Sequence, residues 1–211
     1  MTPLSRRAFG TAALASVLVG CGGDGAEEGA QPGSRRRRDV EASEEDASAS
    51  ASANPPHTLG RSDPVRLRIP AIAVDTPVIR LGLAPDGTVE VPPITADDRA
   101  GWYRHSPTPG QVGPSVVLGH VTVGPYGDGV FRRLDRLRRG DRIEVRRTDG
   151  TAAEFAVSAV RTVAKADFPA KDVYGDVARP EVRLITCGGP RTGDEYRDNV
   201  IVFAELSSPS P

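Results

Sequence analysis

Two residues of this chain have side chains suited to nucleophilic catalysis, and glycine lies beside both. Cys187 follows the apolar run Leu184–Thr186 and precedes two glycines. His120 directly follows the apolar run Val116–Gly119. Glycine lets the backbone turn and leaves room for a substrate to approach. A thiol and an imidazole that meet can transfer an acyl group, because the sulfur attacks a carbonyl carbon while the ring moves the proton.

His120 is selected by context from the three histidines of the chain. His57 lies in a stretch rich in Ala, Ser and Pro, and His105 lies in a loop-like stretch after Trp102–Arg104. The ring is needed because a free thiol is only about 3% thiolate at pH 7, and a nearby imidazolium favours the anion. The alternative for Cys187 is a structural role, since a free thiol packs well inside a strand.

The amino terminus has the features of an export signal. Ser5–Phe9 contains a twin-arginine pattern, and the apolar stretch Gly10–Val19 is shorter than the ~20 residues of a membrane-spanning helix. The stretch ends in Leu18–Cys21, which resembles the bacterial lipoprotein signature. We therefore expect residues 1–20 to be a signal peptide of the twin-arginine, lipoprotein type and Cys21 to carry a lipid anchor.

A lipid on Cys21 would anchor the chain to the outer face of the cell membrane. The alternatives are an ordinary signal peptide cleaved elsewhere, or a disulfide between Cys21 and Cys187. The signal context of Cys21 disfavours the disulfide. Residues 21–60 hold almost no large apolar side chains, so we expect a disordered tether.

The charge of the chain is nearly balanced. It has 27 basic and 28 acidic residues, which gives no sign of a nucleic-acid partner. Acidic residues such as Asp97, Asp98, Asp194 and Glu195 are scattered rather than spaced as in a calcium loop. We therefore expect neither a metal site nor a cofactor.

From residue 61 to 207 the pattern changes to short runs of β-branched and aliphatic residues between Gly, Pro and Asp. This pattern predicts a β-rich domain. The predicted strands are Val65–Ile69, Val74–Leu81, Ser115–Gly119, Arg142–Arg147, Ala153–Val163, Val182–Thr186 and Asn199–Leu206. Periodicity leaves a closed barrel and a sandwich as alternatives.

Two local patterns predict further elements within this β-rich domain. Asp149 and Gly150 between two predicted strands indicate a tight hairpin whose two central residues both take positive φ. Phe131, Leu134 and Leu137 recur at helical spacing, which predicts one short helix.

Three motifs, in this order and separation, resemble the sortase family. They are Gly119-His120 after an apolar strand, Leu184–Cys187 on a late strand, and an arginine shortly before the last strand. The resemblance extends from about residue 64 to 206. Flanking features that look most like the actinobacterial class F branch are Val130-Phe131 with Leu134 and Leu137, Gly140-Asp141, Lys165, and Tyr196 with Asp198-Asn199-Val200.

The resemblance implies a fold and an activity for residues 61–207. The fold is all-β, a closed eight-stranded barrel with one or two short helices. The activity is that of a cysteine transpeptidase, which cleaves a Leu-Pro-x-Thr-Gly-type sorting signal between Thr and Gly and joins the acyl group to an amine of a cell-wall precursor. The partners would be proteins that carry sorting signals and the amine acceptor, and the enzyme would act as a monomer.

The resemblance also implies three catalytic roles, of nucleophile for Cys187, proton carrier for His120 and oxyanion donor for an arginine. Arg197 is our choice for the arginine. Counting back from Ala204, however, places Asn199 where many sortases have it, and strand alternation puts both on one face.

Other assignments stay open. Arg191 is a weaker candidate for the third role, and Arg197 could instead be a solvated charge. We expect Thr186 to contribute to substrate or oxyanion binding. The competing functions are a cell-wall cysteine hydrolase or peptidase, and a non-catalytic binding lipoprotein in which Cys187 is inert.

Overall fold

The computed structural model describes residues 58–95, 98–193 and 195–207. The predicted signal peptide, Cys21, His57 and nearly all of the predicted tether lie outside these residues. Within the described ranges, no helix has both the length and the apolar character needed to cross a membrane.

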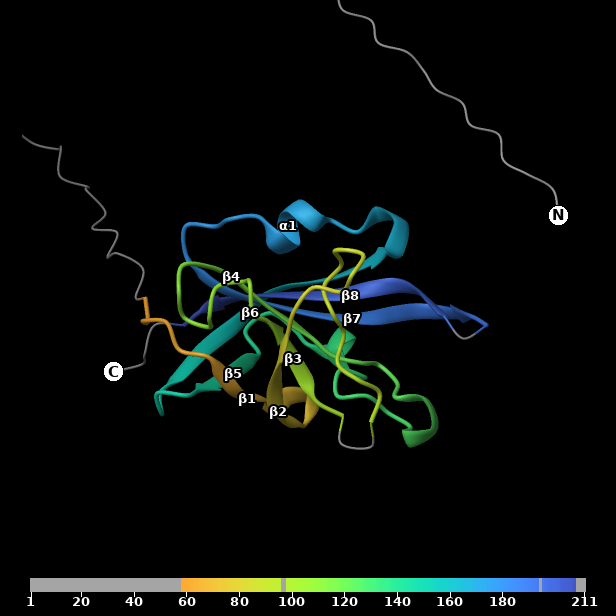
Figure 1. Ribbon diagram of the computed structural model, residues 1–211, viewed down its shortest axis with the longest axis horizontal. Coiled ribbons are helices and arrows are strands. Elements are labelled where there is room, and N and C mark those ends of the chain that lie inside the picture. The colour runs from red at the N-terminus through yellow and green to blue at the C-terminus, as the bar shows by residue number, and fades with distance from the viewer. Residues whose placement is uncertain (1–57, 96–97, 194, 208–211) are drawn as a thin grey trace, which may run out of the picture. The chain divides into compact units, whose positions relative to one another are not determined.

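Eight strands of the described residues close into a barrel in the order β1-β2-β3-β4-β7-β8-β6-β5 (Figure 1). Their bounds are β1 Pro64–Ile69, β2 Val74–Leu81, β3 Ala100–Tyr103, β4 Gly113–Leu118, β5 Arg142–Arg147, β6 Ala152–Ala164, β7 Pro180–Thr192 and β8 Glu195–Leu206. The helical segments are the 3-10 turns η1 Pro70–Ile72, η2 Gly124–Tyr126, η3 Leu134–Arg136 and η4 Lys165–Asp167, and the α-helix α1 Ala170–Tyr174. The closed eight-stranded barrel is confirmed, and the sandwich alternative is wrong.

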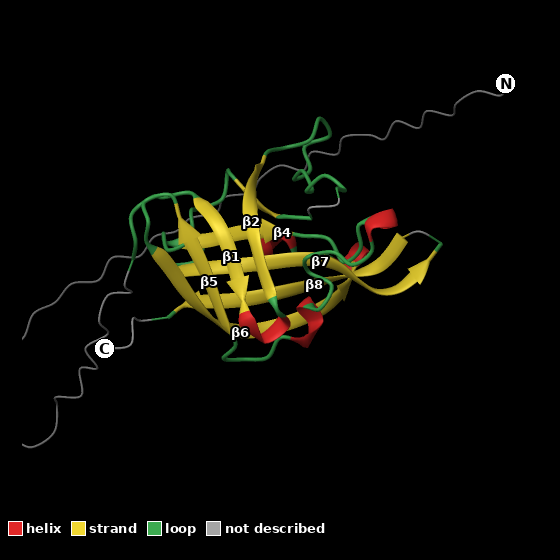
Figure 2. Cartoon of the chain, turned by 90° about the horizontal axis from the view of Figure 1, so that it is seen from below, coloured by secondary structure: helices red, strands yellow, loops and turns green. Residues whose placement is uncertain are grey.

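Every predicted strand is present, with changes at the ends. β3 was not predicted, because its four residues include a glycine and are too few to show alternation. β7 and β8 run well beyond the predicted Val182–Thr186 and Asn199–Leu206, and Figure 2 shows them continuing past the barrel as a hairpin.

The predicted short helix around Phe131, Leu134 and Leu137 is present but shorter than the spacing suggests. Only the 3-10 turn η3, Leu134–Arg136, forms there, although all three apolar side chains are buried in the barrel core. Their spacing therefore reflects successive turns that each place one side chain inward.

The predicted hairpin at Asp149-Gly150 is present between β5 and β6, but its turn differs. Gly150 has φ 82°, whereas Asp149 is not among the described non-glycine residues with positive φ. The backbone N–H of Arg147 donates to the carbonyl of Thr151, which leaves a three-residue loop. Such loops place a single residue in the left-handed region, and here that residue is the glycine.

Side chains alternate between the two faces of β4, β7 and β8, so that each face carries its own apolar cluster. Val117, Leu184 and Val202 lie in the barrel core. Val116 and Ile201 lie on the outer face, where they pack with Val173 of α1. Figure 1 shows α1 above β4, β7 and β8. This alternation decides to which face each later residue of these strands belongs.

The parallel pairing of β4 with β7 is extended beyond the end of β4. The ladder runs without a shift as far as Leu118 opposite Ile185. The N–H of Gly119 then donates to the carbonyl of Ile185 over 3.1 Å. The buried hydroxyl of Thr186 donates to the carbonyl of Gly119 over 2.8 Å. These bonds hold the chain after β4 in register with β7.

We expect Phe155→Ala to lower the free energy of unfolding by about 3–5 kcal/mol, since truncating a buried Phe leaves a cavity. Phe155 is 0% exposed in the barrel core. Denaturant titration with an unchanged slope checks this value. Val65→Ala is the control, because Val65 is 42% exposed and its loss should cost under about 0.5 kcal/mol. Equal effects of the two substitutions would contradict the assigned core.

The Thr186 hydroxyl gives a second stability test. Thr186→Val keeps the shape of the side chain but leaves the Gly119 carbonyl without this donor, so a loss of about 1–2 kcal/mol is expected. Thr186→Ser keeps the donor and removes one methyl group, at a cost of about 0.8 kcal/mol. Denaturant titration of both variants should rank Ser above Val. The reverse order would show that the hydroxyl does not hold the two segments together.

Candidate active site

The register of β4 and β7 places His120 beside Cys187. Because Leu118 lies opposite Ile185, the same offset puts His120 opposite Cys187. Cys187 belongs to the outer face of β7, since Ile185, two residues earlier, packs in the outer cluster. The same alternation, continued past the end of β4 at Leu118, assigns the His120 side chain to that face as well. Neighbouring strands lie ~4.8 Å apart, so the thiol and the imidazole are within a side chain's reach of each other.

Three contacts hold His120, two at its backbone carbonyl and one at its ring. The N–H of Phe131 donates to the His120 carbonyl over 2.9 Å. Gly129 passes so close that a Cβ there would lie 2.3 Å from the same carbonyl oxygen, which requires glycine. The ring nitrogen Nε2 lies 2.6 Å from the backbone carbonyl oxygen of Pro92. The ring is therefore fixed by the connection between β2 and β3.

The predicted strand Val182–Thr186 placed Cys187 just after a strand end. In the structure Cys187 lies within β7 instead. β7 continues to Thr192, and its pairing with β8 is interrupted by a bulge between Gly188 and Arg191. A Cβ on Gly188 would lie 2.6 Å from a methyl carbon of Val200. Gly189 has φ 71°. The glycines thus serve the close packing of β8 and the bulge, and the thiol remains half-buried.

A cavity of about 340 Å³ borders Cys187. Its other lining residues include Thr186, Phe131, Tyr196 and Val200. Val200 belongs to the barrel core, so this cavity opens on the inward side of β7 and β8 rather than on the face shared with His120.

Asn199 and Arg197 both follow the outer-face alternation of β8, as expected. Asn199 is the direct cross-strand partner of Cys187, and on its other side it pairs with Val163 of β6. Arg197 is two residues away, at the diagonal position, and its side chain is exposed. Directly opposite side chains lie ~5 Å apart and diagonal ones ~7–8 Å, which a long side chain can span.

Arg191 is engaged elsewhere. Its guanidinium carbon lies 5.4 Å from the centre of the Tyr196 ring, and Tyr196 is its cross-strand partner. Tyr196 is next to Arg197 on β8, so its side chain lies on the opposite face of the strand from those of Arg197 and Asn199. This contact makes Arg191 the least suitable of the three candidates.

The outer face of β7 becomes charged at the end away from Cys187. Arg183 pairs with Glu181, and both side chains are buried. The guanidinium of Arg183 lies 4.6 Å from the centre of the Phe203 ring. Burial lowers the pKa of Arg183 to about 10, so it stays charged at neutral pH. The face therefore runs from a reactive thiol through an apolar stretch to an ion pair.

The remaining sequence candidates lie apart from this pair. His105 is exposed and packs edge-on against Tyr103, with 5.4 Å between ring centres. Among the described residues no group of three or more His, Cys, Asp and Glu is arranged to hold a metal ion. Sequence analysis missed Pro92, because its contact with His120 uses a backbone carbonyl, which has no residue-specific signal.

The fold and the site can be compared with known proteins. The sortase domain family matches residues 67–207, well over half of the chain. No curated protein matches this chain.

Solved structures that match are also sortases. The sortase D5 transpeptidase of Clostridium perfringens has 20% identity and a TM-score of 0.52, over 69% of this chain and 79% of its own. Sortase C-1 of Actinomyces oris has 24% identity and a TM-score of 0.53, over 69% and 76%. A lid mutant of sortase A from Corynebacterium diphtheriae has 19% identity and a TM-score of 0.53, over 72% and 74%. At these identities the structures support the fold, and the domain match supplies the family.

The closed eight-stranded barrel carries Cys187 and His120 at corresponding positions of β7 and of the chain just after β4, within a stretch that matches the sortase domain. The chain belongs to the sortase family of cysteine transpeptidases.

Proposed function

We propose that this enzyme cleaves a Leu-Pro-x-Thr-Gly-type sorting signal between Thr and Gly and joins the acyl group to an amine of a cell-wall precursor. The observation that carries the proposal is the unshifted parallel register of β4 and β7 up to Leu118 opposite Ile185, which, continued by two residues, aligns His120 with Cys187. This arrangement supplies a nucleophile and a proton carrier to the same scissile bond, the first to its carbonyl carbon and the second to its nitrogen.

In the first half of the reaction the Cys187 thiolate attacks the threonine carbonyl carbon. His120, as imidazolium, gives its proton to the departing glycine nitrogen, and the C–N bond breaks. The product is a thioester between the sorting signal and Cys187, with free glycine amine as the leaving group.

In the second half an amine attacks the thioester carbonyl. His120, now neutral, accepts a proton from the incoming nitrogen, and the thiolate of Cys187 leaves as the amide forms. Water in place of the amine would give hydrolysis, which is the competing activity. A half-buried rather than fully exposed thiol supports the view that access of water is restricted.

The third role is the stabilisation of the oxyanion. We assign it to Arg197, whose diagonal position lets a long cationic side chain approach the carbonyl oxygen attacked by Cys187. Asn199, directly opposite Cys187, is the alternative donor, and its shorter amide can reach the same place. Thr186 contributes indirectly, because its hydroxyl is used to hold Gly119 and thereby the neighbouring His120.

The apolar outer face supports the proposed substrate. Leu118, two residues before His120, and Tyr103 belong to the outer cluster and are only half-buried. These side chains would suit the leucine and proline that precede the scissile bond.

The cellular setting is part of the proposal. Residues 1–20 act as a twin-arginine lipoprotein signal, Cys21 anchors the enzyme to the outer face of the membrane, and residues 21–60 tether the catalytic domain, 61–207. The enzyme acts as a monomer of the class F type, which the flanking residues of the sequence favour.

The test uses the full chain with a quenched Leu-Pro-x-Thr-Gly peptide and a small amine. We expect ligated product in preference to free acid, measured by mass spectrometry. Cys187→Ala should abolish turnover, and His120→Ala should lower kcat/KM by at least about 10²-fold, as expected for loss of a general acid and base. Free acid alone, at any amine concentration, would identify a hydrolase instead.

The same assay separates the two candidates for the third role. Arg197→Ala should lower kcat by about 10²–10³-fold, because an oxyanion donor acts mainly in the transition state. Asn199→Ala should have a smaller effect. Full activity of the Arg197 variant together with loss in the Asn199 variant would transfer the role to Asn199.

A further inference from the structure

The connection between β2 and β3 reaches the ring of His120. We call residues 82–95 of this connection the β2–β3 strap. Within it, Pro92 is buried, and its carbonyl oxygen lies 2.6 Å from Nε2 of His120. This distance is that of a short hydrogen bond, just under the usual range of about 2.7–3.2 Å.

The contact determines which ring nitrogen can react. A backbone carbonyl can only accept, so Nε2 of His120 must donate and must carry a hydrogen. That hydrogen is present in both the neutral and the cationic ring. Nδ1 is therefore the nitrogen that loses and regains a proton during each catalytic cycle.

The strap is built to hold this carbonyl in one place. Pro92 is followed by Pro93. The ring of Pro92 fixes its own φ, and the following proline restricts Pro92 to extended conformations. At its start the strap is closed by a bridge between Leu83 and Val89. The N–H of Gly82 donates to the Glu90 carboxylate over 2.6 Å, and the N–H of Glu90 donates to the Gly82 carbonyl.

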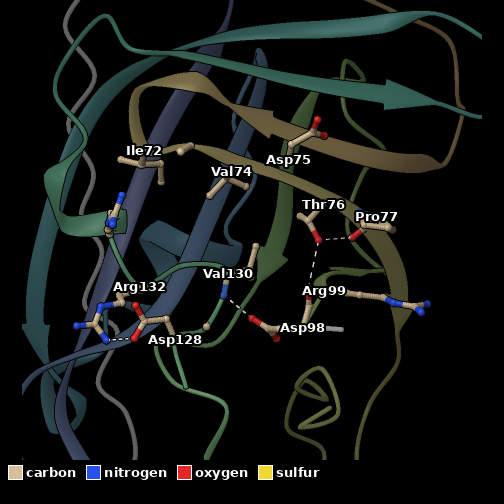
Figure 3. Close-up of a pocket in the computed structure, with 13 residues that line it drawn as sticks. Ile72, Val74, Asp75, Thr76, Pro77, Asp98, Arg99, Asp128, Val130 and Arg132 are labelled. Atoms are coloured by element: carbon tan, nitrogen blue, oxygen red, sulfur yellow. Dashed lines mark hydrogen bonds and ion pairs between the residues drawn. The ribbon is translucent and has the colours of Figure 1, made fainter. Parts of the chain in front are cut away.

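The chain just after the strap is fixed to the segment that holds the His120 backbone. The carboxylate of Asp98 accepts a hydrogen bond from the N–H of Val130, and the backbone carbonyl of Asp98 accepts one from the Thr76 hydroxyl (Figure 3). The next residue, Phe131, donates to the His120 carbonyl. Hydrogen bonds thus hold the ring of His120 from the strap and its backbone from the segment that Asp98 contacts.

We propose that the Pro92-Pro93 pair is a positioning element of the active site. It fixes the His120 ring through the Pro92 carbonyl, keeps the hydrogen on Nε2, and leaves Nδ1 as the proton-transferring atom. This inference rests on the proposed function for its kinetic consequence, but its structural part concerns the ring alone.

The first test is ¹⁵N NMR of the histidine rings in the full chain, with His120→Gln to assign the His120 signals. At a pH where the ring is neutral, we expect the hydrogen on Nε2 and a bare Nδ1. Since the Nε2–H form is also common in free histidine, the deciding signal is protection of this hydrogen from exchange with water. A bare Nε2, or an Nε2–H that exchanges as fast as that of exposed His105, would overturn the proposal.

The second test loosens the strap with Pro93→Gly. Pro85→Gly is the matched control, because it makes the same change in the exposed turn of the same strap. We expect Pro93→Gly to lose the protection of Nε2–H and to lower kcat about tenfold, with KM changed less than about twofold, because a misoriented general acid loses only part of its contribution. Pro85→Gly should change neither quantity.

The outcomes separate the two proposals. In one outcome the Nε2–H of the wild-type chain is protected, Pro93→Gly abolishes this protection, and the wild-type chain ligates no peptide to an amine. That outcome would support the positioning element and refute the proposed function. Normal ligation with unchanged protection and kcat in Pro93→Gly would refute the positioning element alone. Thermal unfolding shows whether Pro93→Gly is folded, and if it is not, the wild-type exchange measurement decides.

Discussion

The site depends on the parallel register between β4 and β7. These strands are far apart in the sequence, and their ladder continues through Gly119 by two further hydrogen bonds, one from its N–H and one from the Thr186 hydroxyl. Because side chains alternate with a period of two, a slip of one residue would move the thiol or the imidazole to the barrel interior. A slip of two would separate them by ~6.6 Å along the strands.

The same constraint explains the glycines around the site. Gly129 must pass the His120 carbonyl at a distance that excludes a Cβ, and Gly188 must admit the Val200 side chain. Both glycines therefore allow backbone segments to close around the reactive pair. Their role is packing, whereas the chemistry is carried by the side chains that they bring together.

Much of the barrel could be predicted from the sequence, because long apolar runs reveal strands whatever their partners are. β3 could not, since Ala100–Tyr103 is too short to show a period. Closure of the barrel could not be deduced from periodicity either, because it depends on pairings such as β1 with β5 that link distant segments. The short helix predicted from residues 131–137 is reduced to the 3-10 helix η3, since buried turns can imitate helical spacing.

The candidate site, like the barrel, could be predicted only in part from the sequence. Cys187 and His120 could be proposed from the sequence because few residue types can act as nucleophile or proton carrier, and both follow apolar runs that predict strands. The choice between Arg197 and Asn199 could not, because it depends on the bulge that sets the alignment of β8 with β7. Pro92 could not be found at all, since the atom that contacts His120 belongs to the backbone.

The most direct measurement of the central claim is a disulfide test in a chain that also carries Cys21→Ser. His120→Cys should form an intramolecular disulfide with Cys187 on mild oxidation, detected by peptide mapping, because directly opposite residues of adjacent strands meet the distance requirement. Leu118→Cys, on the same face but two residues earlier, should not, since the diagonal exceeds ~7 Å. Bridging in neither variant, or equally in both, would contradict the register on which this account rests.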